Sequence, residues 1–405
     1  MRPTPAKRAA PEPATDASRP TLVVAGRSAR LLAEAAVRDG YAVIALDCFG
    51  DRDTRRVARQ WWPIGDAGGG APLDAPRTLA ALERAAREPG VIGWVAGSDF
   101  ECEPDLLEQG AARLALIGTA PAAVRRVRDA RRFFAFLATR GFAHPETRFD
   151  APPAPQGWLR KHARGSGGWH IRCADDAPAA DASRGVSPAA DASRGMYYQR
   201  EVAGTPMSAL FIGNGRHARL VGCNELIVRP LGAHPHVFRG AISAGELPAA
   251  QHAALLGMLD ALAGEFELRG LCSLDFIRTE DGRLCLLEIN PRPSASMALY
   301  ADLPLLRAHV ESCREHTLVD LAPMPASTVR GSEIVFARKA FELSAAQAQA
   351  LAERDDCHDL PAAGNRFAAG DPVCSVQADG PAAQAVRERL AEKRQALRAR
   401  WALEA

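Results

Sequence analysis

Lysine is scarce in this sequence. It occurs only at positions 7, 161, 339 and 393, although lysine and arginine together number 50. Because arginine supplies almost all of the positive charge, an internal lysine such as Lys161 suggests a task that a compact ammonium performs better than a planar guanidinium. The formal net charge of +2 gives no argument for a nucleic acid or a membrane as a partner.

Other absences narrow the class of protein. None of the nine cysteines forms a CxxC pair, so neither a zinc ribbon nor a redox pair is indicated. No apolar run reaches the roughly 18 residues of a membrane-spanning helix, and no apolar stretch typical of a secretory signal follows the first charged residues. With 47% hydrophobic and 24% charged residues, the composition is that of an ordinary globular protein. We therefore expect a cytoplasmic protein.

The pattern of apolar residues divides the chain of 405 residues into parts. Residues 1–20 are rich in proline and alanine without periodicity, and we expect a disordered tail. Residues 21–120 begin with the strand–helix–strand pattern TLVVAG, RSARLLAEAAVRDG and YAVIALD, which predicts a Rossmann-like domain with a parallel sheet. The first turn, GRSARL, lacks the GxGxxG spacing, so an NAD-dependent oxidoreductase is only a rival hypothesis.

A second α/β region is expected over residues 121–330, beginning with a helix at 121–140. Residues 331–405 are expected to form short strands and a final helix. Within the second region, PAADASRG occurs twice, starting at residues 178 and 188. A tandem copy of this composition predicts an expanded surface loop at about residues 174–195.

The stretch LCSLDFIRTE-DG-RLCLLEIN predicts a β-hairpin. Asp281-Gly282 between two apolar runs is a strong signal for a two-residue type I′ turn. With that turn, Asp275 lies directly opposite Glu288, with Cβ atoms about 4.5–5.5 Å apart. The strand period of two then places every second residue on the face of Glu288: Leu284, Leu286, Asn290 and Arg292.

Two opposed carboxylates among apolar neighbours repel each other, so either one binds a proton or a cation lies between them. The oxygens of Asp275, Glu288 and Asn290 are hard ligands of the kind that Mg²⁺ prefers, commonly together with the phosphates of a nucleotide. The alternative is a solvated hairpin face with accidental acids. The apolar side chains of Leu284 and Leu286 on the same face argue against that alternative, and the hairpin therefore predicts a magnesium site.

A glycine-rich loop follows the internal lysine in WLRKHARGSGGWHIR, residues 158–172. Glycines let backbone N–H groups approach an anion, so the segment 165–168 can cradle a phosphate, with Lys161 as a point charge. The spacing is not that of a P-loop, and an ordinary surface loop is the alternative. In MYYQREVAG, residues 196–204, a strand ends at a turn whose backbone groups can contact the edge of an adenine, although a plain strand and turn is the simpler interpretation.

Three motifs resemble those of the ATP-grasp superfamily and occur in the same order along the chain. They are Lys161 with GSGG, the strand YYQREVAG, and LDF followed by LLEINPRP. The chain is similar, more closely, to predicted ATP-dependent carboligases of the carboxylate–amine ligase type, which occur beside genes for one-carbon carriers. The resemblance covers roughly residues 21–330. It implies an α/β ATP-grasp fold with a Rossmann-like N-terminal domain, a lid at about 157–215, and a small β-rich C-terminal tail domain.

The resemblance also implies roles for individual residues. Lys161 would contact the ATP phosphates and take part in catalysis with Arg292, which would bind an anionic substrate or the acyl phosphate. Asp275, Glu288 and Asn290 would hold Mg²⁺, with Mn²⁺ as an alternative. The other cofactor contacts would come from the lid loop, the hinge strand and an arginine in place of a second family lysine: Gly165, Ser166, Gly167, Gly168, Gln199, Glu201, Val202 and Arg131.

By that resemblance, we expect an ATP- and Mg²⁺-dependent ligase that activates a carboxylate as an acyl phosphate and joins it to an amine, with ATP converted to ADP and phosphate. The gene context of the similar proteins suggests the synthesis of a one-carbon carrier of the methanopterin or methylofuran type. Two alternatives remain: a non-catalytic nucleotide-binding or scaffold protein with a degenerate ATP-grasp fold, and a carboxylation like that of biotin carboxylase. We expect small-molecule substrates, no nucleic acid or membrane as partner, and a homodimer by default.

Overall fold

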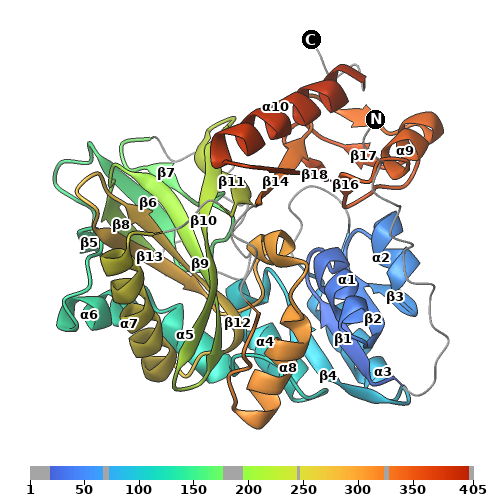
Figure 1. The fold of residues 1–405 in the computed structure, drawn as a ribbon, viewed down its shortest axis with the longest axis horizontal. Helices are drawn as coiled ribbons and strands as arrows, with labels where there is room; N and C mark the ends of the chain where they lie inside the picture. The colour runs from blue at the N-terminus through green and yellow to red at the C-terminus, as the bar shows by residue number, and fades with distance from the viewer. Residues whose placement is uncertain (1–18, 67–72, 177–194, 244–246, 323–327, 401–405) are drawn as a thin grey trace.

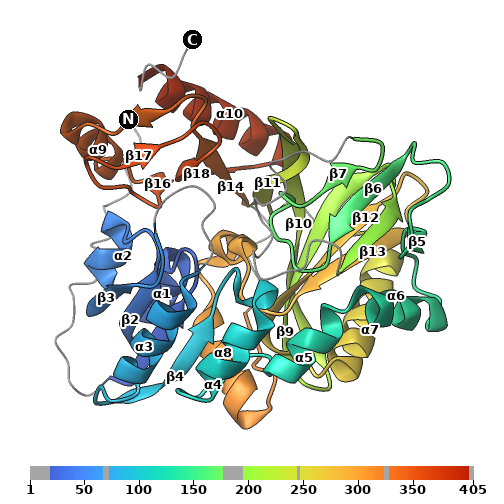
Figure 2. The same cartoon turned by 180° about the vertical axis from the view of Figure 1, so that it is seen from behind.

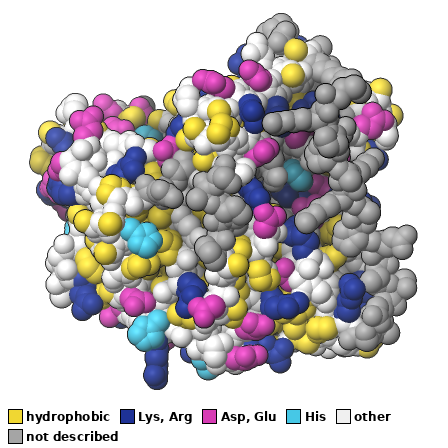
Figure 3. All heavy atoms as spheres, in the orientation of Figure 1, with side chains coloured by type: hydrophobic (Ala, Val, Ile, Leu, Met, Phe, Trp, Pro, Cys, Tyr) yellow, Lys and Arg dark blue, Asp and Glu magenta, His cyan; other side chains and the backbone are white. Residues whose placement is uncertain are grey.

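The computed structural model describes residues 19–66, 73–176, 195–243, 247–322 and 328–400. Most of the expected tail at 1–20 and of the expected repeat loop at 174–195 lies outside these residues. Among the described residues, no helix has both the length and the apolar character needed to cross a membrane. On the face seen in Figure 3, acidic and basic side chains are interspersed, consistent with the small net charge of +2.

The N-terminal part is a parallel sheet with helices on both faces (Figure 1). It contains the strands β1 (Thr21–Ala25), β2 (Ala42–Asp47), β3 (Gln60–Pro63) and β4 (Val91–Ala96) and the helices α1 (Arg30–Arg38), α2 (Arg52–Val57), α3 (Ala75–Ala85) and α4 (Pro104–Ala111). The strands run in the order β3-β2-β1-β4. Successive residues of β1 face opposite sides, so Leu22 packs with α1 and Val23 packs with α3 and α4. This double coverage explains the continuous apolar runs in the sequence, and the Rossmann-like expectation is confirmed.

Two short helices and a small antiparallel sheet follow. The expected helix at 121–140 is two helices, α5 (Pro121–Val127) and α6 (Ala130–Thr139). The break occurs because the Asp129 side chain caps α6 by accepting hydrogen bonds from the first backbone N–H groups of that helix. The lid sheet has the order β5-β8-β6-β7 and consists of β5 (Thr147–Arg148), β6 (Trp158–His162), β7 (Arg172–Cys173) and β8 (Met196–Arg200).

The largest sheet has eight antiparallel strands. In spatial order these are β13 (Leu284–Asn290), β12 (Arg269–Arg278), β9 (Thr205–Asn214), β10 (Ala218–Leu231), β11 (His234–Ile242), β14 (Val329–Phe336), β18 (Pro372–Gly380) and β16 (Cys357–His358). Neighbouring residues of β9 point to opposite faces, so Phe211 packs with helix α7 (Ala249–Glu265) and Ile212 packs with helix α8 (Leu305–Glu315) and the N-terminal sheet. The sheet thus lies between two apolar cores.

The C-terminal segment continues this large sheet. The expected boundary at residue 330 falls inside β14, whose strand pairs with β11 on one side and β18 on the other. The division of the chain into domains therefore stays a prediction. The other elements here are a short helix η2 (Ala295–Tyr300), β15 (Phe341–Glu342), α9 (Ala345–Ala352), β17 (Arg366–Phe367) and the final helix α10 (Ala383–Arg400). In Figures 1 and 2, the C-terminal segment and the N-terminal sheet lie on the same side of the molecule.

Candidate active site

The hairpin of β12 and β13 brings Asp275 opposite Glu288, and the predicted pairing is confirmed. The predicted two-residue turn is wrong. The backbone N–H of Thr279 donates to the Arg283 carbonyl at 3.0 Å, and Gly282 adopts a φ of 83°, so three residues connect the strands. A three-residue loop commonly ends in a residue with this left-handed conformation, which glycine adopts without strain.

A β-bulge restores the predicted pairing. The ladder shifts between Asp275–Glu288 and Phe276–Leu286, so Leu287 is the extra residue on β13. The bulge turns Leu287 toward the cavity beside Glu288. The expectation that Leu284 and Leu286 share the face of Glu288 is wrong, because both pack in the apolar core with helix α7.

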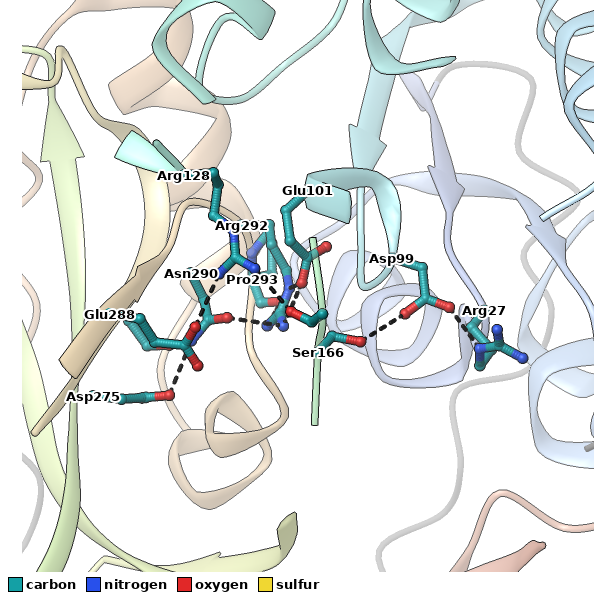
Figure 4. Close-up of polar contacts among 12 residues, drawn as sticks. Arg27, Asp99, Glu101, Arg128, Ser166, Asp275, Glu288, Asn290, Arg292 and Pro293 are labelled. Atoms are coloured by element: carbon teal, nitrogen blue, oxygen red, sulfur yellow. Dashed lines mark hydrogen bonds and ion pairs between the residues drawn. The ribbon is translucent and has the colours of Figure 1, made fainter. Parts of the chain in front are cut away.

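The acid pair belongs to a polar network, which Figure 4 shows. Burial, and then the charge of Glu288, raises the pKa of Asp275 to about 7. Burial raises the pKa of Glu288, but the charges of Arg128, His170 and Lys161 together with the Arg128 hydrogen bond outweigh it and leave that pKa below its usual value. The Arg128 guanidinium donates to Glu288 Oε2 at 3.0 Å. The two carboxylates thus share one region of negative potential that a guanidinium partly neutralises.

Asn290 bridges the acid pair and Arg292. Its amide nitrogen donates to Asp275 Oδ2 at 3.1 Å, and its amide oxygen accepts from Arg292 Nη2 at 3.3 Å. In this conformation the two carboxylates, rather than the Asn290 amide, offer oxygens toward a cation. Asp275, Glu288, Asn290 and Arg292 therefore lie together on one face, as expected. Coordination of a metal ion by the amide oxygen of Asn290 would require this amide group to flip.

Glu101 holds Arg292 in place. Glu101 Oε1 accepts a hydrogen bond from Arg292 Nε at 2.8 Å and lies 2.7 Å from Arg292 Nη2 in the same ion pair. Glu101 is only 3% exposed. Glu101 lies in a short helix, η1 (Phe100–Cys102), just after β4. Sequence reasoning missed this residue. Its position at the carboxyl end of a parallel strand was the available signal, because ligand sites gather at that edge of a sheet.

Lys161 is buried on β6 and lines the cavity. Its ammonium donates to Gln199 Oε1 at 2.7 Å. Burial lowers the pKa of Lys161, while the nearby charges of Glu288 and Asp275 raise it. Gln199 is 1% exposed and orients the lysine, while its expected contact with the cofactor stays a prediction. Glu201 and Val202 follow β8 and line the same cavity.

The lid loop packs on strand β11. The Phe238 N–H donates to the Gly167 carbonyl at 3.0 Å, and a Cβ on Gly168 would lie 1.8 Å from the His236 carbonyl oxygen. Ser166 Oγ donates to Asp99 Oδ1 of the N-terminal part at 3.4 Å. Ser166, Gly167 and Gly168 line the cavity, and the glycines permit close packing on β11. Contact of this loop with ATP phosphates stays a prediction.

Arg131, the arginine expected to contact the cofactor, does not line the cavity, and Arg128 rather than Arg131 contacts the acid pair. The Arg131 side chain is exposed on α6 and lies over the Phe149 ring at 4.1 Å. Arg128 lies in the break between α5 and α6, where it donates to the Ala163 and Gly165 carbonyls, both at 2.8 Å, as well as to Glu288. Arg128 therefore ties the lid to the acid pair. The cap residue Asp129 was the only sequence signal for this break.

One cavity of about 840 Å³, within the size range of small-molecule sites, is lined by the acid pair, Asn290, Arg292, Lys161 and residues 166–168. Glu101, Arg128 and Gly165 are not among its lining residues. One end lies between the lid and the acid pair, and the cavity reaches residues of the N-terminal sheet and the C-terminal segment. The sequence model of the ATP-grasp domain family matches residues 127–296 of this chain. No curated relative matches the chain in sequence.

Several solved structures are similar to this chain. Biotin carboxylase from Campylobacter jejuni has a TM-score of 0.66 and 13% identity, over 92% of this chain and 90% of that chain. N5-carboxyaminoimidazole synthase from Aspergillus clavatus has a TM-score of 0.64 and 14% identity, over 95% of this chain and 100% of that chain. L-amino acid ligase from Bacillus licheniformis has a TM-score of 0.64 and 12% identity, over 92% of this chain and 96% of that chain. The chain thus carries an ATP-grasp domain and has the ATP-grasp fold, as its resemblance in sequence predicted.

Proposed function

We propose that this chain is an ATP- and Mg²⁺-dependent ligase that activates a carboxylate as an acyl phosphate and couples it to an amine. The observation that carries the proposal is the pair of Asp275 and Glu288, directly opposed on β12 and β13. Both line the same cavity as Lys161. A pair of hard anionic oxygens beside a buried ammonium is suited to a metal ion and the phosphates that it accompanies.

The residues present fit both cofactors. Two partly buried carboxylates provide ligands for Mg²⁺, and Mn²⁺ shares the preference for oxygen. Similar folds have been solved with ADP and 5-aminoimidazole ribonucleotide in N5-carboxyaminoimidazole synthase, and with MgADP and bicarbonate in a Hydrogenobacter thermophilus biotin carboxylase domain. These structures support ATP and Mg²⁺ as cofactors. When bound, Mg²⁺ would neutralise the negative charge of the phosphates.

The chain's own residues would then position the reactants. Lys161, oriented by Gln199, would contact phosphate oxygens. Arg292, oriented by Glu101, would bind the substrate carboxylate through its planar guanidinium. The lid loop, tied down by Arg128, would exclude water, which otherwise hydrolyses an acyl phosphate. Most of the acceleration would come from this positioning and from charge stabilisation.

The proposed reaction has two steps. A carboxylate oxygen attacks the γ-phosphorus of ATP, the bond to the bridging oxygen breaks, and ADP leaves with the bonding electrons. The neutral amine then attacks the carbonyl carbon of the acyl phosphate, phosphate leaves, and the nitrogen loses a proton to give the amide. Only the sequence resemblance supports the finer proposal that the product belongs to the synthesis of a one-carbon carrier.

The test is the substitution Glu288→Gln, with Asp275→Asn as a parallel variant. We expect ADP formation with a panel of carboxylic acids and amines to fall by roughly 100-fold or more, because metal-assisted charge stabilisation is worth several kcal/mol. Glu280→Gln is the matched control, since Glu280 is an exposed residue of the same hairpin. Wild-type turnover by Glu288→Gln in the presence of Mg²⁺ would refute the metal role.

Carboxylation is a second candidate, favoured by the similarity to biotin carboxylase. It predicts ADP formation that depends on bicarbonate in place of an organic carboxylic acid, with a nitrogen nucleophile as the acceptor of the carboxyl group. A non-catalytic nucleotide-binding protein would instead bind MgATP and release no phosphate with any acid. Assays of the wild-type protein with bicarbonate, with acid and amine, and with ATP alone separate these three functions.

A further inference from the structure

We propose that Asp51 binds an ammonium group of the substrate, at the end of the cavity where the N-terminal sheet meets the C-terminal segment. This proposal rests on the proposed ligase function and adds a substrate class to it: one of the two substrates carries a protonated amine that stays unreacted. The argument depends on the partners of Asp51, on the balance of charge around it, and on its place in the cavity.

Asp51 lacks the hydrogen bonds that satisfy its neighbours. Asp47 accepts from the Ala29 and Gly50 N–H groups and from Trp61 at distances of 3.0, 2.8 and 2.6 Å. Asp51 is only 6% exposed, lines the cavity, and makes no cap hydrogen bond with α2 although it occupies the cap position. Across the described residues, no group donates a hydrogen bond to its carboxylate.

Asp53, two residues further on, is also satisfied. Its carboxylate accepts from the Asp359 and Leu360 N–H groups at 2.8 and 3.0 Å. The Arg52 N–H donates to the Leu360 carbonyl at 2.8 Å. These bonds fix the start of α2 against the C-terminal segment. Asp51 therefore has a rigid backbone and an unsatisfied side chain, which is the arrangement of a preformed polar contact for a ligand.

The charges around Asp51 favour a cationic ligand. Arg30 is the buried cation of this region, and its guanidinium is already shared. It donates to Asp359 at 2.9 and 3.1 Å and to Glu34 at 3.1 Å, and it lies 3.9 Å from Asp53. Three carboxylates thus share one buried guanidinium, and Asp51 adds a further acid to the same region of the cavity wall. A buried carboxylate without a counter-charge is costly, and a positively charged group of the substrate would remove that cost.

An organic ammonium fits this place better than a metal ion. Ligand atoms of Glu34, Asp53 and His358 lie within 4.8 Å of one another. However, both oxygens of Asp53 already accept backbone hydrogen bonds, and Arg30 donates to Glu34. A dication would lie against that guanidinium, whereas an ammonium carries a single charge and donates directly to the free carboxylate of Asp51.

The proposed contact between Asp51 and the ammonium group would be separate from the reacting groups of the substrate. Arg292 and Asp51 line one continuous cavity, and apolar side chains including Phe49 and Phe367 line it as well. The reacting carboxylate would lie at Arg292, so an ammonium at Asp51 belongs to another part of the substrate. Such remote contacts orient a substrate and supply binding energy to the reacting end.

The test uses n-butylammonium chloride as the probe and 1-butanol as its uncharged counterpart, with sodium chloride at equal ionic strength. Without nucleotide, we expect the melting temperature of the wild-type protein to rise by about 1–2 °C at saturating probe. The rise should disappear in Asp51→Asn and Asp51→Ser, and 1-butanol should give none. An equal rise in wild type and both variants, or no rise in wild type, would overturn the proposal.

Two further variants make the result specific. Asp99→Asn removes another carboxylate of the cavity wall, one already paired with Arg27 at 2.5 Å, and should keep the response to butylammonium. Glu288→Gln should keep that response and lose the response to MgATP. A protein that binds MgATP but not butylammonium would retain the proposed ligase function and lose only this inference. A rise with Mg²⁺ alone that Asp51→Asn removes would assign a metal site and overturn it as well.

Discussion

Glu101 and Arg292 are 191 residues apart in sequence and form a largely buried ion pair, in which Arg292 Nε donates to Glu101 Oε1 at 2.8 Å and Nη2 lies 2.7 Å from the same oxygen. The pair connects the N-terminal sheet to the end of the hairpin that carries the acid pair (Figure 4). The second oxygen of Glu101, Oε2, is buried and has no hydrogen-bond partner among the described residues. The geometry of Arg292 therefore depends on a residue from a different part of the chain.

Replacing Glu101 by glutamine should lower the free energy of unfolding by about 3 kcal/mol, because Arg292 would remain buried without its counter-charge. Urea denaturation measures the loss. Glu103→Gln is the control, since Glu103 lines the cavity that Arg292 also lines. This substitution should change the free energy of unfolding little. A change in Glu101→Gln as small as that of the control would show that solvent, rather than this pair, neutralises Arg292.

Gly168→Ala should weaken MgATP binding by at least about tenfold. Gly168 has a φ of 77°, and a Cβ would lie 1.8 Å from the His236 carbonyl oxygen, so the lid loop could not pack on β11. The matched control is Gly232→Ala, at a φ of 58° with nothing within 4 Å; it should cost about 1 kcal/mol of backbone strain and leave binding unchanged. Calorimetric titration with MgATP compares the two, and equal affinities would contradict a closing role for the loop.

Arg128→Met should loosen the lid. The variant removes the hydrogen bonds to the Ala163 and Gly165 carbonyls, so amide hydrogen exchange in residues 163–168 should become faster, since local opening costs less free energy. Arg132→Met removes an exposed arginine of α6 and should leave exchange unchanged. Unaltered protection of the loop in Arg128→Met would mean that packing on β11 alone holds it.

Asp51→Asn should stabilise the protein in a pH-dependent way. Burial raises the pKa of Asp51, as do the charges of Asp359, Asp53 and Asp47, and Arg30 lowers it less. The unfolded chain gives up this proton near pH 4, whereas the folded protein holds it to higher pH, so the carboxyl costs stability above about pH 4. The free energies of unfolding of wild type and variant should match below that pH and diverge above it, in favour of the variant. Denaturation curves across this range would contradict the prediction if the difference stayed constant.

The sequence contained the information for the pairing of Asp275 with Glu288, although the turn and the bulge were both missed. A three-residue loop shifts the register by one residue, and the bulge at Leu287 shifts it back. Strand register is set by which side chains must be buried, and the apolar runs of β12 and β13 fix that. The prediction for Leu284 and Leu286 failed because the bulge lies between them and Glu288 and puts them on the opposite face, in the core with α7.

The ATP-grasp fold also followed from the order of motifs along the chain. Which arginine enters the site did not. Arg128 and Arg131 belong to one arginine-rich run, and only the helix break at Asp129 turns the first inward and leaves the second exposed. Local sequence gives both residues the same chemistry, so the direction of each side chain is decided by the packing of the helices.

What the sequence determined by itself is therefore local: the strands, the glycine loop and the opposed acids, each encoded within a few neighbouring residues. The tertiary structure decided the pairing of Glu101 with Arg292, the link from Arg128 to the lid, and the unsatisfied carboxylate of Asp51. These contacts join parts of the chain that come together only after folding. The burial of a side chain, and its charge at a given pH, depend on the surroundings that folding creates and not on the residue type alone.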